Sequence, residues 1–234
     1  MDLVFISLAP VVIIAFYIYF RDRYEREPVS ILLTAIVVGA IAVLPIVYIE
    51  RYLNNFGEFF VGRGKAAYTA FIVAGFTEEL FKLLALMLLI WRNRNFNEKF
   101  DGVVYAVFIS LGFATVENLT YVYGYGYDVG VSRAFTAVPA HSLFGVCMGY
   151  FIGIARFYPK RRLIYIMFGL IAPVLLHGVY DFILMGDFQY TNYYFIPYMI
   201  ALLLLGFRLM KVLSKASIYR NDGIGGQDSN LLGI

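Results

Sequence analysis

The sequence has a single cysteine, Cys147, and only two histidines among its 234 residues. One cysteine cannot form an intramolecular disulfide, and a cysteine-rich metal site is excluded. Charge is also scarce, because 15% of the residues are Asp, Glu, Lys or Arg, against about 25% in ordinary soluble domains. The hydrophobic fraction is 61%, so the composition predicts an integral membrane protein.

Linkers and targeting signals are missing as well. No Pro/Gly/Ser-rich stretch divides the chain, so we expect one transmembrane domain, residues 1–212, and a mobile cytoplasmic tail, residues 213–234. The start lacks a basic n-region and a small-residue cleavage site, so the first apolar segment is expected to remain as a span. The net charge of +3 is small and lies at the ends of the apolar runs, which points to membrane topology rather than to nucleic acid.

Seven apolar runs are long enough to cross a bilayer, which predicts an all-α polytopic bundle of about seven transmembrane helices. With the N-terminus outside, the inner segments hold 14 Lys and Arg residues and the outer segments hold 4. The positive-inside rule therefore predicts an external N-terminus and a cytoplasmic C-terminus. The runs cover residues 3–20, 29–49, 67–91, 102–123, 135–155, 163–185 and 193–210, and the stretch 54–64 is a candidate for dipping into the interface.

The third run carries charges where a membrane span normally has none. Glu78, Glu79 and Lys82 lie inside an apolar segment that extends from Ala67 to Trp91. A charged group at that depth costs about 2.5–3.5 kcal/mol on insertion scales, so it is retained mainly for a function. Adjacent residues on a helix point about 100° apart, so we expect one glutamate to face the reacting atoms and the other to orient it.

Four more polar side chains occur inside later runs: Glu117, His141, His177 and Asp181. His177 and Asp181 share one helix face because they are four residues apart, as do Glu78 and Lys82. The helical rise places these groups in the outer half of the bilayer or near its midplane. We therefore expect them to meet in one water-accessible cavity that opens outward.

Two chemistries suit this set. Glu117, His141 and His177 with an open fourth position would suit a catalytic Zn²⁺, although the H-E-x-x-H motif is absent and the ligands would come from separate helices. Alternatively, a glutamate deprotonates water without a metal, and a histidine stabilises the oxyanion. The residues allow both.

Purely structural roles are also open to the same residues. Glu78 and Glu79 can pair with Lys82, Glu117 can bond Tyr121 when protonated, His141 can be a satisfied core histidine, and His177 can bond Asp181. Cys147 is expected in the core. The series Gly145, Gly149 and Gly153 predicts close helix packing, and Asp128 and Arg133 are expected to be solvated on an outer loop.

These motifs also resemble those of a known family, the PrsW intramembrane proteases, which are related to the CAAX-protease and bacteriocin-processing group. The resemblance covers most of the chain. It rests on Glu78-Glu79-x-x-Lys82, Phe113-x-x-x-Glu117, His141 with its glycine series, His177-x-x-x-Asp181, the opening Arg21 to Pro28 and the run Asp101 to Tyr105.

The resemblance implies a multi-pass protease of the bacterial cytoplasmic membrane. Such a protease makes the first, extracytoplasmic-side cut in a single-span anti-sigma factor during regulated proteolysis in a stress response. Lys82 and Asp181 depart from the CAAX pattern, which leaves prenylated substrates unsupported. The alternatives are a proton-coupled transporter, although matching broken half-helices are not evident, and a non-catalytic scaffold that binds a partner helix.

Overall fold

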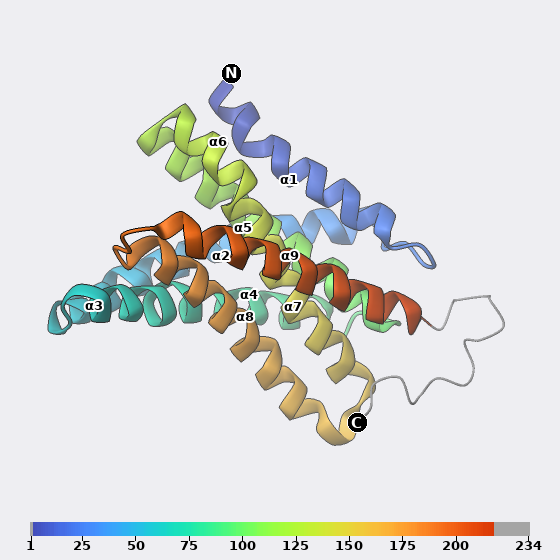
Figure 1. Cartoon of the computed structure of the whole chain (residues 1–234). Coiled ribbons are helices and arrows are strands. Elements are labelled where there is room, and N and C mark those ends of the chain that lie inside the picture. Colours follow the sequence, from blue (N-terminus) through green and yellow to red (C-terminus); the bar gives the residue numbers. More distant parts are fainter. Residues whose placement is uncertain (1, 218–234) are drawn as a thin grey trace.

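The computed structural model describes residues 2–217, and these residues form helices and turns without a strand (Figure 1). Of the predicted tail, residues 213–217 are described and residues 213–215 belong to the last helix, whereas residues 218–234 lie outside the described residues. In chain order the elements are α1 (Asp2–Arg21), α2 (Val29–Asn54), η1 (Asn55–Phe59), α3 (Gly62–Tyr68), η2 (Thr69–Phe76), α4 (Thr77–Ile90), α5 (Lys99–Tyr125), α6 (Tyr127–Phe135), α7 (Ala137–Phe157), η3 (Pro159–Arg161), α8 (Arg162–Met185) and α9 (Thr191–Lys215).

The prediction of an all-helical fold with several membrane-spanning helices is confirmed. Within residues 2–217, six helices are long and apolar enough to cross a membrane, so this is a multi-pass cell membrane protein. The third predicted span is present as α3, η2 and α4, which follow one another from Gly62 to Ile90 with a π-helical segment in the middle. The orientation of the termini stays a prediction. The segment before the fifth span contains an additional short helix, α6, which the apolar pattern did not indicate.

Two helices, α5 and α7, form the centre of the bundle (Figure 1). Of the most apolar 18-residue stretch, 78% is buried in α5 and 83% in the segment formed by α6 and α7, whereas 17% is buried in α1. The predicted glycine ridge explains their contact. A Cβ built on Gly149 would lie 2.3 Å from the carbonyl oxygen of Gly102, and one on Gly153 would lie 2.1 Å from that of Lys99. Only glycine lets the two backbones approach this closely.

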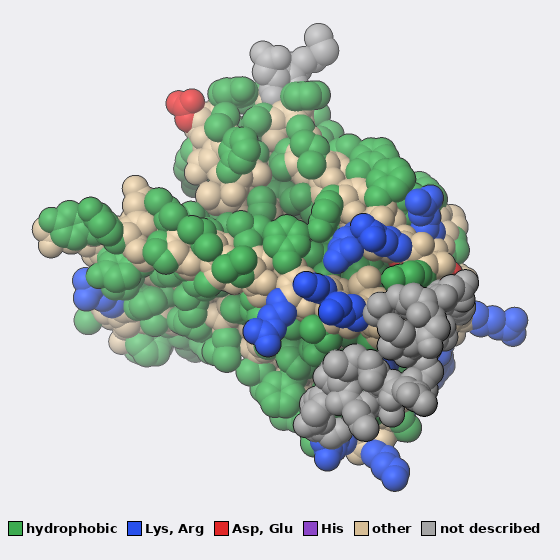
Figure 2. Space-filling view, turned by 45° about the vertical axis from the view of Figure 1, so that its right-hand side comes forward, with side chains coloured by type: hydrophobic (Ala, Val, Ile, Leu, Met, Phe, Trp, Pro, Cys, Tyr) green, Lys and Arg blue, Asp and Glu red, His purple; other side chains and the backbone are tan. Residues whose placement is uncertain are grey.

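The remaining helices surround this pair. α1 packs against α5 and α6, α2 against α5, and α8 and α9 against α7. The predicted core position of Cys147 is confirmed, because this free cysteine is 4% exposed. Figure 2 shows hydrophobic side chains over most of one face, as a lipid-facing surface requires, with Lys and Arg side chains gathered on one part of it.

Candidate active site

The charged residues of the third span begin α4. Lys82 Nζ lies 3.2 Å from Glu78 Oε2 and 2.9 Å from Glu79 Oε1, so the ammonium pairs with both carboxylates from positions i+4 and i+3. All three side chains are buried, with Glu79 and Lys82 at 0% exposure. The ion pairing that was one of the structural alternatives is therefore present, and it holds the two acids side by side.

The π-helical segment η2 directly precedes these residues and packs against α8. π-helices are rare, short and frequent at functional sites. At its end, a Cβ on Gly75 would lie 3.2 Å from the carbonyl oxygen of Val174 and 3.3 Å from the amide nitrogen of Gly178, both on α8. The lack of a side chain at Gly75 thus lets α8 approach, which brings His177 beside the glutamates.

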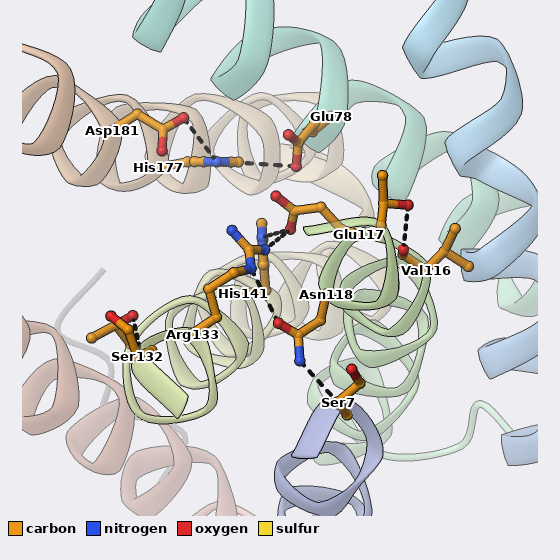
Figure 3. Close-up of polar contacts among 12 residues, drawn as sticks. Ser7, Glu78, Val116, Glu117, Asn118, Ser132, Arg133, His141, His177 and Asp181 are labelled. Atoms are coloured by element: carbon orange, nitrogen blue, oxygen red, sulfur yellow. Dashed lines mark hydrogen bonds and ion pairs between the residues drawn. The ribbon is translucent and has the colours of Figure 1, made fainter. Parts of the chain in front are cut away.

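His177 on α8 lies between carboxylates (Figure 3). Its Nδ1 is 3.0 Å from Glu79 Oε1 and 3.9 Å from Glu78 Oε2, and its Nε2 is 3.3 Å from Asp181 Oδ2. The i, i+4 pairing predicted for His177 and Asp181 is confirmed. Asp181 therefore fixes the orientation of the imidazole, with one ring nitrogen turned toward the acids of α4.

His141 on α7 repeats this arrangement. Its Nδ1 is 3.2 Å from Lys82 Nζ, and its Nε2 is 2.7 Å from Glu117 Oε2 on α5. The rings of His141 and His177 are 5.1 Å apart between centroids. Each histidine thus directs Nε2 to a carboxylate and Nδ1 toward the α4 charges, and Glu117 pairs with His141 instead of Tyr121.

A divalent metal fits this donor set. One ligand atom each from Glu78, Glu79, His141 and His177 lie within 4.8 Å of one another. Two imidazoles with carboxylates are ligands that Zn²⁺ accepts, and a carboxylate on the far nitrogen of each histidine is the usual support of a metal-bound imidazole. Glu117, which was expected among the ligands, is outside this group and bonds the far nitrogen of His141.

The predicted site residues converge on one cavity of about 630 Å³. Its lining includes Glu78, Glu117, His141, His177 and Asp181, which come from α4, α5, α7 and α8. Glu79 and Lys82 are buried beneath them and do not line it. As expected for adjacent residues, the two glutamates point in different directions: Glu78 lines the cavity, and Glu79 is bonded to Lys82 and His177.

Two cavity residues were missed or misjudged from the sequence. Arg133 was expected to be solvated, and that expectation is wrong: its Nη2 lies 2.8 Å from Glu117 Oε2 and its side chain is 14% exposed. It lies in α6, outside the predicted spans, so the apolar pattern gave no reason to bring it inward. Glu50, at the end of the second span, also lines the cavity. The only indication of this position in the sequence is that Glu50 directly follows the predicted second span. Asp128 is exposed, as expected.

An all-helical membrane bundle with a buried carboxylate, lysine and histidine centre under a polar cavity defines a candidate intramembrane hydrolase. Residues 27–205 match the PrsW family intramembrane metalloprotease. The chain is 38% identical to Protease PrsW of Bacillus subtilis (strain 168), over 88% of this chain and 92% of that protein. It is 37% identical to Protease PrsW of Clostridioides difficile (strain 630), over 86% and 87% respectively.

Protease PrsW of Shouchella clausii (strain KSM-K16) is 35% identical over 93% of this chain and 99% of its own length. This chain therefore belongs to the PrsW family of intramembrane proteases, and it is a peptidase. The family resemblance seen in the motifs is confirmed. No solved structure matches the chain significantly.

Proposed function

We propose that this protein is an endopeptidase that hydrolyses a peptide bond of a single-span membrane protein, with Glu78 as the base that activates water. The observation that carries the proposal is the division of the acid pair. Glu78 lines the cavity within reach of both histidines, whereas Glu79 is fully buried and bonded to Lys82 and His177.

The chemistry follows from this arrangement. Glu78 takes a proton as a water oxygen attacks the carbonyl carbon, and it returns the proton to the nitrogen when the C–N bond breaks. The Lys82 ammonium donates to Glu78, Glu79 and His141 Nδ1 beneath the cavity, so its positive charge would favour the oxyanion electrostatically without direct contact. Glu117 and Asp181 hold the two imidazoles, so they act as positioning residues.

The same residues would hold a metal. His141 Nδ1, His177 Nδ1 and Glu79 offer three ligands and leave Glu78 free as the base, which is the arrangement of a catalytic zinc site with one open position. When bound, the Zn²⁺ would supply Lewis-acid polarisation of the carbonyl. The role of Glu78 is the same with the metal or with Lys82 as the central cation.

We further propose that the substrate is a single-span anti-sigma factor cut on the extracytoplasmic side. The support is the resemblance of the motifs to the family and the predicted topology, which puts the cavity in the outer half of the membrane. Glu50, Glu117 and Asp181 all line the cavity, at ends of their helices that the loop charges assign to the outer side.

The test is cleavage of a single-span anti-sigma-factor-like reporter in liposomes by purified protein, with the cut site read by mass spectrometry. Glu78→Gln should reduce cleavage at least about 100-fold, since a general base contributes roughly 10²–10⁴. Glu58→Gln, an exposed acid in η1, is the matched control and should cleave normally.

Equal cleavage by wild type and Glu78→Gln would contradict the assignment of the base. A cut on the cytoplasmic side would contradict the topology but leave the chemistry intact. Chelator treatment followed by addition of Zn²⁺ separates the metal-dependent mechanism from the metal-free one, because only the former regains activity on addition.

A further inference from the structure

The two histidines of the catalytic centre differ in what holds their partner carboxylates. Asp181, which contacts His177, belongs to the same helix as that histidine, four residues further on. Glu117, which contacts His141, lies on another helix, and its Oε2 is 2.8 Å from Arg133 Nη2 of α6. The contact of His177 with Asp181 is thus set within α8, whereas that of His141 with Glu117 depends on how α5, α6 and α7 pack together.

The guanidinium of Arg133 is held by three residues from about one turn of α5. Besides the ion pair with Glu117, its Nε donates to Asn118 Oδ1 at 3.1 Å (Figure 3). Its central carbon lies 3.9 Å from the centre of the Tyr121 ring. Asn118 is fully buried and donates in turn to the backbone carbonyl oxygen of Ser7 in α1, at 3.1 Å. A planar guanidinium can make such contacts at the same time, which a lysine ammonium cannot do.

The close approach of α6 depends on a glycine one turn before Arg133. A Cβ built on Gly130 would lie 2.9 Å from Val122 Cγ2 of α5 and 3.0 Å from Ile6 Cγ2 of α1. The lack of a side chain at Gly130 therefore lets α6 pack against both helices. Arg133 is thereby brought to the wall of the catalytic cavity, where its side chain is 14% exposed.

The donors around His141 assign the proton of its ring. The Lys82 ammonium has only donors, and its Nζ is 3.2 Å from His141 Nδ1, so Nδ1 accepts. The ring proton is then on Nε2, which donates to Glu117 Oε2 at 2.7 Å. Arg133 contacts the same carboxylate oxygen, and its charge stabilises Glu117 as the acceptor.

We propose that Arg133 is a positioning residue for the reaction: by holding Glu117, it fixes the tautomer and the orientation of His141. The expected effect on the rate rests on the proposed peptidase mechanism, in which His141 belongs to the catalytic centre. The competing role for an arginine that lines the cavity is to bind the substrate. The two roles differ in whether the loss of Arg133 changes kcat or KM.

The first measurement is the kinetics of reporter cleavage in liposomes. Arg133→Gln should lower kcat about tenfold and change KM less than about twofold, since residues that support a catalytic imidazole are worth roughly 10–100-fold. Arg133→Lys keeps the charge without the fork, so its kcat should fall between those of Arg133→Gln and the wild type. Arg51→Gln removes an exposed arginine of α2 and should cleave as the wild type does.

A double variant tests whether Arg133 acts through Glu117. Arg133→Gln combined with Glu117→Gln should have the kcat of Glu117→Gln alone, within about twofold, because both changes remove the same contact. Two residues that act independently would instead multiply their effects on kcat.

The second measurement does not depend on activity. The chain contains two histidines, so NMR of protein with ¹⁵N-labelled histidine reports two imidazoles, and His177→Ala identifies the signals of His141. In metal-free wild type, Nε2 of His141 should carry the proton. In Arg133→Gln both tautomers should be present, whereas Arg51→Gln should give the wild-type spectrum.

The proposal is overturned if Arg133→Gln raises KM at constant kcat, because Arg133 then binds the substrate, or if the two changes multiply in the double variant. A reporter that the wild type does not cleave would contradict the proposed function instead. The NMR spectrum still decides the role of Arg133 in that case, because wild-type signals of His141 in both Arg133→Gln and Arg133→Lys would overturn it. If Arg133→Gln does not fold, Arg133→Lys alone decides, and a wild-type kcat together with a wild-type spectrum overturns the proposal.

Discussion

Residues 2–217 include two buried groups of carboxylates, and these groups differ in the side chains that surround them. At the catalytic centre Glu78 and Glu79 lie beside Lys82, and two histidines complete the group. The second group, which we call the loop acid cluster, consists of five acids bonded in part by Tyr105, Ser217 and backbone N–H groups; they are Asp22, Glu25, Glu27, Glu98 and Asp101. The first group contains its own cation, whereas in the second group burial raises the pKa of Asp22 and of Glu27 to about 7. α5 connects them, with Asp101 near one end and Glu117 near the other.

Removing the cation of the catalytic centre would make it resemble the loop acid cluster, and we expect the largest effect from this change. Lys82→Met leaves two fully or largely buried acids without their partner, which costs about 3–5 kcal/mol in comparable ion pairs. Denaturant unfolding in detergent should show this loss, with the exposed Lys65→Met as the control. Unchanged stability would mean that the acids are neutral without Lys82.

Asp181 and Glu117 are carboxylates of the catalytic centre that contact histidines and not the reacting atoms, so their loss should have a smaller effect. Asp181→Asn and Glu117→Gln should each lower kcat about 10–100-fold, with a small change in KM, since the imidazoles lose their orientation. The proteins should fold normally. A rise in KM at constant kcat would instead indicate that these acids bind the substrate.

Much of the catalytic centre could be predicted because charge is so costly inside a membrane span. Every residue proposed from the sequence, from Glu78 to Asp181, lies at or beside the cavity. The position of Arg133 in the cavity could not be predicted, because this residue lies in a short amphipathic helix outside the predicted spans. Its contact with Glu117 depends on the fold. The pairing of Glu117 with His141 depends on helix rotation, which residue spacing within a single helix does not determine.

The loop acid cluster was not foreseen for a related reason. Asp22, Glu25 and Glu27 lie between spans, where acidic residues are ordinary and normally solvated. Glu27 is bonded to Tyr105, 78 residues later, and Glu25 to Asn97, 72 residues later, so no local pattern in the sequence marks the cluster. The π-helical segment likewise follows from tertiary packing, since its residues read as a continuous apolar helix.

The packing of α5 against α7 is the next feature to test, because α5 carries Asp101 of the loop acid cluster and Glu117 of the catalytic centre. Gly149→Ala would place a Cβ 2.3 Å from the Gly102 carbonyl oxygen. Overpacking of this kind costs about 1–3 kcal/mol. Gly124→Ala is the matched control, because a Cβ there meets no other atom within 4 Å. Thermal unfolding should separate the two variants, and equal stability would show that α5 and α7 can move apart freely.

The smallest effect is expected at Cys147, which tests whether the centre at Glu78 accounts for all hydrolysis. This thiol is 4% exposed and belongs to the packed interior of α7, and its burial in apolar surroundings makes it inert. Cys147→Ala should lose about 1 kcal/mol of stability at most and keep its cleavage rate within about twofold. Thiol-alkylating reagents should likewise leave the wild type active. Loss of cleavage in the variant, together with a normal unfolding midpoint, would identify the thiol as the nucleophile instead of a Glu78-activated water. The acid pair of α4 would then have no catalytic role to distinguish it from the loop acid cluster.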